Sequence, residues 1–374
     1  MGDRLAVGVR LWAVCPACVG VAALLLAGCA KPASEPAEAD MWSLVGPTMG
    51  TRYSLSVVGG DQQAADRLRR LVDERLAVVN KRMSTYDPGS ELSRFNASDS
   101  IDWFGVSAET ALVVRSALEL AEATGGAYDP TVGPLVNLWG FGPDGRRDTR
   151  PTDDEIARAA ERVGYGFVEA RLDPPALRKQ RPGVYVDLSS IAKGHGVDVV
   201  AELLEREGVA AFMVEIGGEV RTRGEKPGGR PWRIGVEKVA GDATTDSADR
   251  PLQLIVELRG ESLATSGDYR NFFELGGRRY SHTIDPKSGE PVEHDLATVT
   301  VQAETCREAD GLATALLVLG PRAGYDWAVE RGVAALLVSR SESDEHLEQT
   351  TPGWDERVAV APTQPTGPTG ADEP

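Results

Sequence analysis

The sequence predicts an α+β fold in which antiparallel sheets pack against helices. Its 374 residues are 41% hydrophobic, which is enough to bury a sizeable core. Several long segments carry apolar residues at helical spacing, and several short segments alternate apolar and polar residues as strands do. Turn residues separate many of the short segments, and the helices do not alternate regularly with them. This arrangement favours hairpins over parallel βαβ units.

The first 28 residues have the pattern of an export signal and are excluded from the predicted fold. Arg4 and Arg10 precede an apolar run over residues 19–27. That run is shorter than the ~20 residues that a membrane-spanning helix needs. It ends in Leu-Ala-Gly before Cys29, which resembles a bacterial lipobox and implies a lipid anchor on the Cys29 thiol. The alternative is an ordinary signal peptide in which Cys29 is incidental.

The rest of the chain divides into three predicted parts. Residues 29–41 are rich in Pro, Ala and Glu and predict a flexible tether. A folded body over 42–340 follows, and then a polar, Pro- and Thr-rich disordered tail over 341–374. Of the four cysteines only Cys306 lies in the body, so the core must stabilise it without an internal disulfide. The net charge of −17 argues against non-specific nucleic-acid binding, which needs a basic surplus.

The first half of the body predicts one strand and three helices. The strand covers 51–58, after a turn at 46–51. A helix over 61–82 places Leu68, Leu76 and Val79 on one face, and a polar turn over 83–92 follows it. Further helices are predicted over about 107–124 and over 152–163, the latter with acidic residues in its first turn.

The loop over 125–136 predicts the wall of a pocket. It is dense in Gly and Pro, short of charges, and leads into an aromatic-rich segment over 138–142. Loops on the surface are usually polar, so an uncharged loop around the single carboxylate of Asp129 suits a ligand. A purely structural loop is the alternative.

The stretch over 184–196 predicts a strand that turns into an amphipathic helix. The free N–H groups at the start of such a helix favour an anion, and Lys193 would add a charge for a phosphate. Asp187 would accept from a polar ring edge or help to hold a cation. The alternative is a helix cap formed by Ser189 or Ser190, with Lys193 as a surface residue.

The second half of the body predicts mainly strands. They cover 212–216, 232–237, 252–258 and 296–303, with a mobile polar loop over 239–250 and a hairpin that turns at 276–277. The first of them runs into Gly217-Gly218-Glu219, where missing side chains would let the backbone approach a ligand. One more helix and strand after the helix over 306–318 are expected to close the body near Val338.

The helix over 306–318 carries a pair of oxygen-bearing side chains on one face. Asp310 and Thr314 are four residues apart, so they lie on the same side of the helix. A carboxylate and a hydroxyl suit a hard cation such as Mg²⁺ better than zinc. The alternative is an aspartate that only stabilises the first turn of the helix.

These motifs together resemble the ApbE family of FAD:protein FMN transferases, over roughly residues 42–340. That resemblance implies a T-fold-like architecture and an enzyme that acts outside the cytoplasm. The motifs that carry it come in the family's order: Thr48-Met49-Gly50-Thr51, Met83-Ser84-Thr85-Tyr86, the stretch from Tyr128 to Gly142, Asp187-Leu188-Ser189-Ser190-Ile191-Ala192-Lys193-Gly194, Ser266-Gly267-Asp268-Tyr269, His282-Thr283-Ile284-Asp285-Pro286 and Ala309-Asp310-Gly311-Leu312-Ala313-Thr314-Ala315.

The resemblance also implies roles for the matching positions. The residues implied to contact FAD are Met49, Tyr86, Ala127, Tyr128, Asp129, Asp187, Lys193 and Thr283. The residues implied to hold Mg²⁺ on the pyrophosphate are Ser190, Asp310 and Thr314, with a backbone oxygen of Ala192 or Ala313 nearby. Two positions depart from the family pattern: Glu215 stands where Asn is common and stays unassigned, and Tyr128 stands where Phe is common.

The implied reaction passes FMN from FAD to a threonine or serine hydroxyl of a target protein, forms a phosphoester and releases AMP. The cation and Lys193 would neutralise charge on the pyrophosphate. His282 is the first candidate for the base at the acceptor hydroxyl, because an imidazole titrates near neutral pH, and Asp285 is the second.

Two other functions stay open at this point. One is an FAD pyrophosphatase that uses water as the acceptor, and the other is a flavin-binding lipoprotein without turnover. The family further suggests acceptors among membrane respiratory-complex subunits, and a lipid-anchored location on the extracytoplasmic side of the cell membrane.

Overall fold

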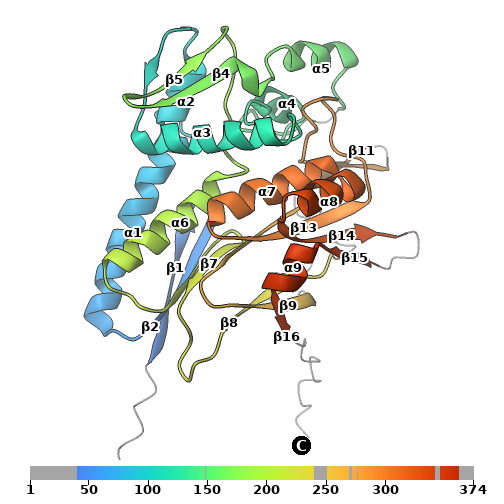
Figure 1. Ribbon diagram of the computed structural model, residues 1–374. Coiled ribbons are helices and arrows are strands. Elements are labelled where there is room, and N and C mark those ends of the chain that lie inside the picture. Colours follow the sequence, from blue (N-terminus) through green and yellow to red (C-terminus); the bar gives the residue numbers. More distant parts are fainter. Residues whose placement is uncertain are drawn as a thin grey trace, which may run out of the picture. The chain divides into compact units, whose positions relative to one another are not determined.

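An eight-stranded sheet forms the centre of the structure, and all neighbouring strands in it run antiparallel (Figure 1). The computed structural model describes residues 40–147, 149–239, 251–268, 272–275, 277–341 and 346–361, all within the compact unit that begins at Ala39. In sheet order the strands are β1 Met41–Thr48, β2 Thr51–Val58, β6 Phe212–Ile216, β7 Glu219–Arg223, β10 Ser262–Gly267, β13 Leu296–Ala303, β14 Ala334–Arg340 and β15 His346–Thr350.

The edge strand β1 was not predicted. Gly46 and Pro47 read as a turn in the sequence, yet both lie within β1. A proline is tolerated there because β1 is an edge strand, whose outer N–H groups need no partner. A side chain at Gly46 would lie 2.4 Å from the Tyr53 ring, so glycine leaves room for that ring on β2. The two strands join through Met49 and Gly50, which both have positive φ and form a tight hairpin turn.

Four helices cover one face of this sheet, as Figure 1 shows. Apolar positions of α1 and α6 pack on β1, β2 and β6 through side chains such as Leu68, Val72 and Leu204. Those of α7 and α8 pack on β10, β13 and β14. The four helices are α1 Gln62–Met83, α6 Ala192–Arg206, α7 Cys306–Leu319 and α8 Pro321–Glu330.

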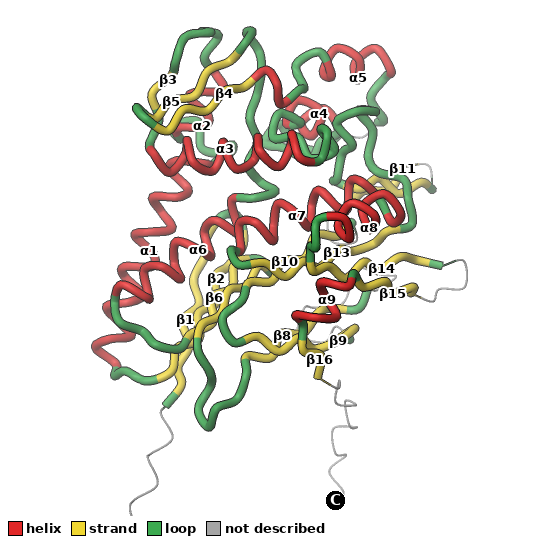
Figure 2. Tube along the Cα trace, viewed as in Figure 1, coloured by secondary structure: helices red, strands yellow, loops and turns green. Residues whose placement is uncertain are grey.

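A small three-stranded sheet and a short helix cover the other face (Figure 2). Their core is built around Trp232 and Trp354, which pack with Val256 and Leu336. The elements are β8 Trp232–Glu237, β9 Leu252–Leu258, β16 Ala359–Ala361 and α9 Pro352–Arg357.

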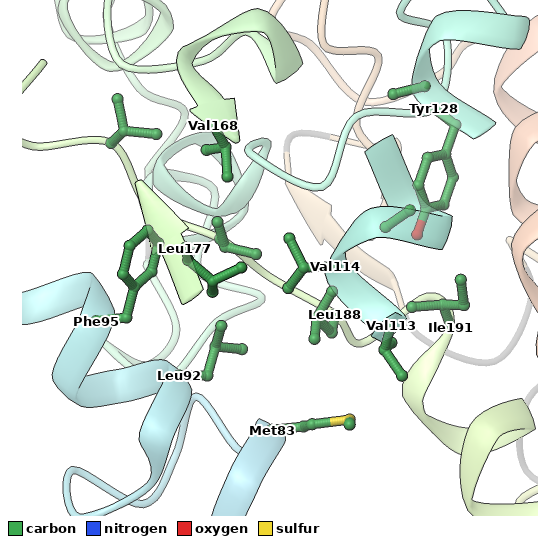
Figure 3. Close-up of a cluster of buried hydrophobic side chains, with 14 of the residues drawn as sticks. Met83, Leu92, Phe95, Val113, Val114, Tyr128, Val168, Leu177, Leu188 and Ile191 are labelled. Carbon is green, nitrogen blue, oxygen red and sulfur yellow. The ribbon is translucent and has the colours of Figure 1, made fainter. Parts of the chain in front are cut away.

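A further layer packs on the outer side of α6 and α7 (Figure 1). Its core contains Phe95, Val114 and Leu177 (Figure 3). Its elements are α2 Glu91–Ala97, β3 Phe104–Gly105, α3 Ala108–Ala123, α4 Gly133–Leu138, α5 Asp153–Ala160, the 3₁₀ turn Tyr165–Phe167, β4 Val168–Leu172 and β5 Pro175–Lys179, with the hairpin β11 Phe272–Leu275 and β12 Arg278–Ser281 beside them.

The predicted α+β class is confirmed, as are the long helices α1, α3, α6 and α7 and the predicted strands β2, β6, β8, β9 and β13. Two predictions in the first half are less complete. The helix α4 forms inside the predicted Gly/Pro loop, and α2 begins at the end of the predicted polar turn. The export signal, Cys29 and residues 240–250 of the predicted polar loop lie outside the described residues.

The predicted strand over 184–188 is wrong, because this segment pairs with no strand that the structure describes. Its backbone is satisfied in another way. The amide of Asn96 donates to the Val186 carbonyl and accepts from the Val186 N–H, both at 2.8 Å. The Asp187 N–H donates to the Pro130 carbonyl at 2.7 Å. The segment is therefore extended, but it is held between α2 and the Gly/Pro loop.

The predicted disordered tail is wrong for residues 346–361, and the body does not close near Val338. β15 extends the central sheet, and Trp354 of α9 is 2% exposed in the core beneath it. The sequence reads as polar because β15 is an edge strand with mostly exposed side chains. Residues 362–374 of the predicted tail lie outside the described residues.

Candidate active site

The candidate site lies where the Gly/Pro loop and the 184–190 segment meet the first turns of α6 and α7. Tyr128 links the two loops. Its ring is 2% exposed within the core of the outer layer, and its hydroxyl points toward the side of Ile191 (Figure 3). The Ser190 hydroxyl donates to the Tyr128 oxygen at 3.0 Å. Burial raises the pKa of Tyr128, so the hydroxyl stays protonated and keeps a hydrogen to donate.

Asp129 holds the loop in shape. One of its oxygens accepts from the N–H and the hydroxyl of Thr131, at 2.7 and 2.6 Å, and the other accepts from the Tyr165 N–H at 2.8 Å. The carboxylate is therefore engaged within the protein. Its hydrogen bonds stabilise the loop that carries Ala127 and Tyr128.

Asp187 and Tyr86 lie near each other at the site, Asp187 buried and Tyr86 exposed. One Asp187 oxygen accepts from the N–H and the hydroxyl of Ser189, which closes the turn before α6. Partial burial and the nearby Asp187 carboxylate raise the pKa of Tyr86, although its side chain is 68% exposed. An exposed aromatic ring beside a carboxylate suits a flat ligand with polar edges.

Three charged side chains from three elements meet beside the first turns of α6 and α7. The Lys193 ammonium on α6 lies 2.6 Å from Glu219 Oε1 on β7 and 3.8 Å from Asp310 Oδ1 on α7. Burial opposes the charge on Lys193, but the two carboxylates outweigh it and raise its pKa. Burial also raises the pKa of Asp310 and of Glu219, against the opposing effect of the ammonium.

Asp310 also ties α7 to the start of α6. Its Oδ2 accepts from the Gly194 N–H at 2.9 Å. A side chain at Gly194 would lie 2.3 Å from the Cys306 carbonyl, so glycine permits the close crossing of the two helices. One turn further along α7, the Thr314 hydroxyl lies 3.0 Å from the Ser266 hydroxyl on β10.

These donors fit a hard divalent cation. Asp310, Thr314 and Ser190 offer a carboxylate and two hydroxyls, which are the oxygen ligands that Mg²⁺ prefers. Glu219 Oε2 is buried and accepts no hydrogen bond from the described residues. Among the described residues, no group of three or more His, Cys, Asp or Glu side chains is arranged to hold a metal ion. These residues therefore do not form the kind of ligand set that zinc prefers.

The segment with His282, Thr283 and Asp285 follows β12. His282 lies edge-on to the Phe141 ring, with centroids 6.3 Å apart, at the end of an aromatic cluster that includes Phe273 and Tyr280. Asp285 Oδ1 accepts from the Lys287 N–H at 2.9 Å, which is the turn chemistry that the sequence indicates. Thr283 is buried, and its N–H donates to the Ser281 hydroxyl.

Met49 stands in the β1–β2 turn with φ of 47°, and it is the one non-glycine residue with positive φ in the described chain. A side chain at Gly196 would lie 2.8 Å from the Met49 methyl group, so the thioether rests directly on α6. A left-handed backbone at a non-glycine residue is strained, and such strain gathers at functional sites.

Sequence reasoning missed three residues of this region. Glu219 directly follows the Gly217-Gly218 pair, where the backbone can approach a ligand closely, and this position in the sequence could have indicated a role for it. Ser266 lay in a recognised motif without a role. Asn96 gave no signal, because its two bonds to Val186 join segments 90 residues apart.

The chain is similar to known proteins over most of its length. A model of the ApbE family matches residues 49–337. The FAD:protein FMN transferase of Vibrio cholerae is 46% identical over 320 residues, which is 85% of this chain and 92% of that protein. The enzyme of the same name from Haemophilus influenzae is 41% identical over 326 residues, 86% of this chain and 91% of that protein.

Solved structures show the same likeness. The flavin transferase ApbE from Vibrio cholerae superposes with a TM-score of 0.76 at 41% identity, over 85% of this chain and 99% of that one. The ApbE protein from Thermotoga maritima superposes with a TM-score of 0.72 at 31% identity, over 85% and 99% of the two chains.

Proposed function

This chain belongs to the ApbE family, and on that premise we propose that it transfers FMN from FAD to an acceptor protein, as an FAD:protein FMN transferase. The observation that carries the chemistry is the meeting of Lys193 and Asp310 at the crossing of α6 and α7. A partly buried ammonium, with a side chain 31% exposed, beside a carboxylate and several hydroxyls is the set that a pyrophosphate with a divalent cation requires.

The reaction is an exchange at phosphorus. The oxygen of an acceptor threonine or serine attacks the phosphorus of the FMN half of FAD, and the bond from that phosphorus to the AMP half breaks. A phosphoester to the acceptor forms, and AMP leaves. The acceptor hydroxyl loses its proton to a base, for which His282 is the first choice and Asp285 the second.

Mg²⁺ is the proposed cation, with Ser190, Asp310 and Thr314 as its ligands and a backbone oxygen of Ala192 or Ala313 nearby. When bound, it would neutralise negative charge on the pyrophosphate oxygens. Lys193 would add a positive charge beside the same oxygens, held in place by its ion pair. The protonated Tyr128 hydroxyl would orient Ser190 through their hydrogen bond.

FAD is proposed to contact Met49, Tyr86, Ala127, Tyr128, Asp129, Asp187, Lys193 and Thr283. The support differs among them. Tyr86 offers an exposed ring, and Asp187 lies beside it. Asp129 acts chiefly through the loop that carries Ala127 and Tyr128, because both of its oxygens already accept backbone N–H groups.

The test is transfer to a defined acceptor. The protein is incubated with FAD, Mg²⁺ and a domain that carries an Asp-x-x-Thr-Gly-Ala-Thr segment, and the acceptor is weighed by intact-mass spectrometry. We expect a gain of one FMN, and its loss with Asp310→Ala. AMP and free FMN without any gain in mass would indicate a hydrolase, and FAD retained without AMP would indicate a binding protein.

We also propose that the protein is lipid-anchored through Cys29 and acts on the extracytoplasmic side of the cell membrane, on exposed domains of membrane respiratory-complex subunits. No helix in the described part of the chain is long and apolar enough to span a bilayer. Expression of the full chain with Cys29→Ser should move it from the membrane fraction to the soluble fraction. Retention in the membrane fraction would contradict the anchor.

A further inference from the structure

The ion pair between Lys193 and Glu219 leaves one carboxylate oxygen unused. Glu219 is 3% exposed, and its Oε1 accepts from the Lys193 ammonium at 2.6 Å. Its Oε2 is buried and has no hydrogen-bond partner among the described residues. Buried acceptors are nearly always satisfied, so an unsatisfied carboxylate oxygen indicates a missing partner that carries a hydrogen or a positive charge.

The charges around this oxygen point to a cation. Asp310 is also 3% exposed, and it shares the single ammonium of Lys193 with Glu219. The negative charge of Asp198, in the middle of α6, also raises the pKa of Asp310. Asp198 itself forms an ion pair with Arg221 at 2.7 Å. Two buried carboxylates against one ammonium leave a surplus negative charge, which is costly without a further positive group.

The backbone of the β6–β7 turn passes close to this oxygen. Gly217 has φ of +64°, and a side chain on it would lie 3.5 Å from Glu219 Oε2 and 3.3 Å from Lys193 Cδ. It would also lie 3.1 Å from the Thr51 methyl group, and the positive φ by itself disfavours a side chain at this position. The Gly-Gly pair before β7 therefore lets the backbone of the β6–β7 turn pass close to a carboxylate oxygen that is itself buried.

We propose that Glu219 is a positioning residue for Lys193 and the second buried carboxylate of the divalent-cation site, beside Asp310. Its Oε1 fixes the ammonium, and its Oε2 supplies an oxygen and a negative charge toward the cation. This inference rests on the proposed function, because the cation belongs to that reaction.

Binding of Mn²⁺ alone to the full-length protein, measured by the decrease of its free electron paramagnetic resonance signal, tests the inference without FAD or turnover. Glu219→Gln removes a negative charge and should weaken Mn²⁺ binding at least about tenfold, whereas Lys193→Met removes a positive charge and should tighten it. If Glu219 and Lys193 merely supported the fold, both Glu219→Gln and Lys193→Met would weaken Mn²⁺ binding. The double variant should fall between the two.

Glu215→Gln is the matched control, because it removes the same charge from β6, and its amide oxygen can still accept from the Gly218 N–H. It should bind Mn²⁺ within about twofold of the wild type. Glu219→Gln within twofold of the wild type would overturn the inference, as would weaker binding by Lys193→Met.

Asp310→Ala separates the two proposals: if it binds Mn²⁺ normally, the proposed cation site itself is wrong. Thermal unfolding of each variant identifies any that fail to fold, and Glu219→Asp then replaces Glu219→Gln, with partial loss expected.

Discussion

Asp310 shows how one side chain can join the two helices of the site. Its Oδ2 accepts from the Gly194 N–H at the start of α6, while its Oδ1 lies 3.8 Å from the Lys193 ammonium. The backbone bond fixes the carboxylate, so its other oxygen is held in one direction. A preorganised oxygen of this kind costs little reorganisation when a charged ligand binds.

His282 gives the sharpest test at the residue scale. We predict that His282→Asn lowers the rate of FMN transfer at least about a hundredfold, because general-base catalysis contributes at least that much. FAD affinity should change little, since the side chain lies against Phe141 at the end of the aromatic cluster. Intact-mass kinetics of the acceptor and a fluorescence titration with FAD measure the two quantities.

Asp285→Asn serves as its comparison. An amide oxygen can still accept from the Lys287 N–H, so the turn after β12 should survive. If His282 is the base, Asp285→Asn keeps most of the transfer rate. Normal transfer by His282→Asn together with its loss in Asp285→Asn would assign the base to Asp285.

At the scale of elements, the C-terminal segment is an integral part of the fold. The Thr351 hydroxyl donates to the Val333 carbonyl at 2.6 Å and accepts from the Ala335 N–H at 3.0 Å. Its side chain is fully buried, and it also caps α9. These bonds hold α9 against β14, although the residues between β14 and β15 read as polar and charged.

We predict that Trp354→Ala lowers the free energy of unfolding by about 3–5 kcal/mol, because it removes a large buried ring from the core between the two sheets. The side chain is 2% exposed and packs with Trp232 and Val256. Val360→Ala on β16 is the control, since Val360 is 54% exposed and should cost within about 0.5 kcal/mol. Urea unfolding followed by circular dichroism compares them, and equal stabilities would mean that the segment does not stabilise the body.

At the scale of the whole molecule, the sequence predicts the long helices α1, α3, α6 and α7 and several buried strands. It misses β7 and β10 of the central sheet and the contacts between distant segments. Periodic apolar residues such as Leu68, Leu76 and Val79 mark a helix locally, because burial follows the helical repeat. The sequence around Val186 alternates as a strand does. In the fold its backbone instead forms hydrogen bonds with the side chain of Asn96, which is 90 residues away in the chain. Edge strands are predicted poorly for a related reason: β1 and β15 have one unpaired side, so their sequences tolerate proline or polar residues.

The same distinction holds for the site. Lys193, Asp310 and Thr314 were predicted because their motifs are local, and the structure brings Lys193 and Asp310 within 3.8 Å of each other. Glu219 was missed because its role depends on β7 lying beside α6 in the folded protein. A local motif can identify a site residue, but its contacts with residues distant in the sequence are seen only in the folded structure.

Glu109 of α3 connects this helix of the outer layer to two helices that cover the central sheet, α1 and α6. Its carboxylate accepts from Arg75 at 2.5 Å and pairs with Arg82, both on α1, and it lies 2.6 Å from His195 Nε2 on α6. Its side chain is 12% exposed. Burial acts to raise its pKa, but hydrogen bonds from His195 and Arg75 outweigh burial and lower the pKa from 4.5 to about 2.

The pH dependence of stability follows from the direction of that shift. Because the folded-state pKa lies below the unfolded value, the stabilisation is fully present above pH 4.5 and is lost as the pH falls toward 2. At about 1.4 kcal/mol per pKa unit, the shift from 4.5 to about 2 is on the order of 3 kcal/mol at neutral pH. Glu109→Gln should therefore lower the free energy of unfolding by at least that order at pH 7, since it also leaves Arg75 and Arg82 without their carboxylate.

The difference between wild type and Glu109→Gln should shrink as the pH falls from 5 to 3, because the unfolded wild-type chain then takes up a proton that the folded chain does not. Urea unfolding at several pH values measures it. Glu119→Gln on the same helix is the control, as the Glu119 carboxylate is 64% exposed and forms an ion pair with the exposed Arg115. It should change stability by less than about 0.5 kcal/mol at every pH. A difference for Glu109→Gln that stays constant from pH 7 to 3 would mean that Glu109 joins the three helices by packing and hydrogen bonds, with no contribution from its charge.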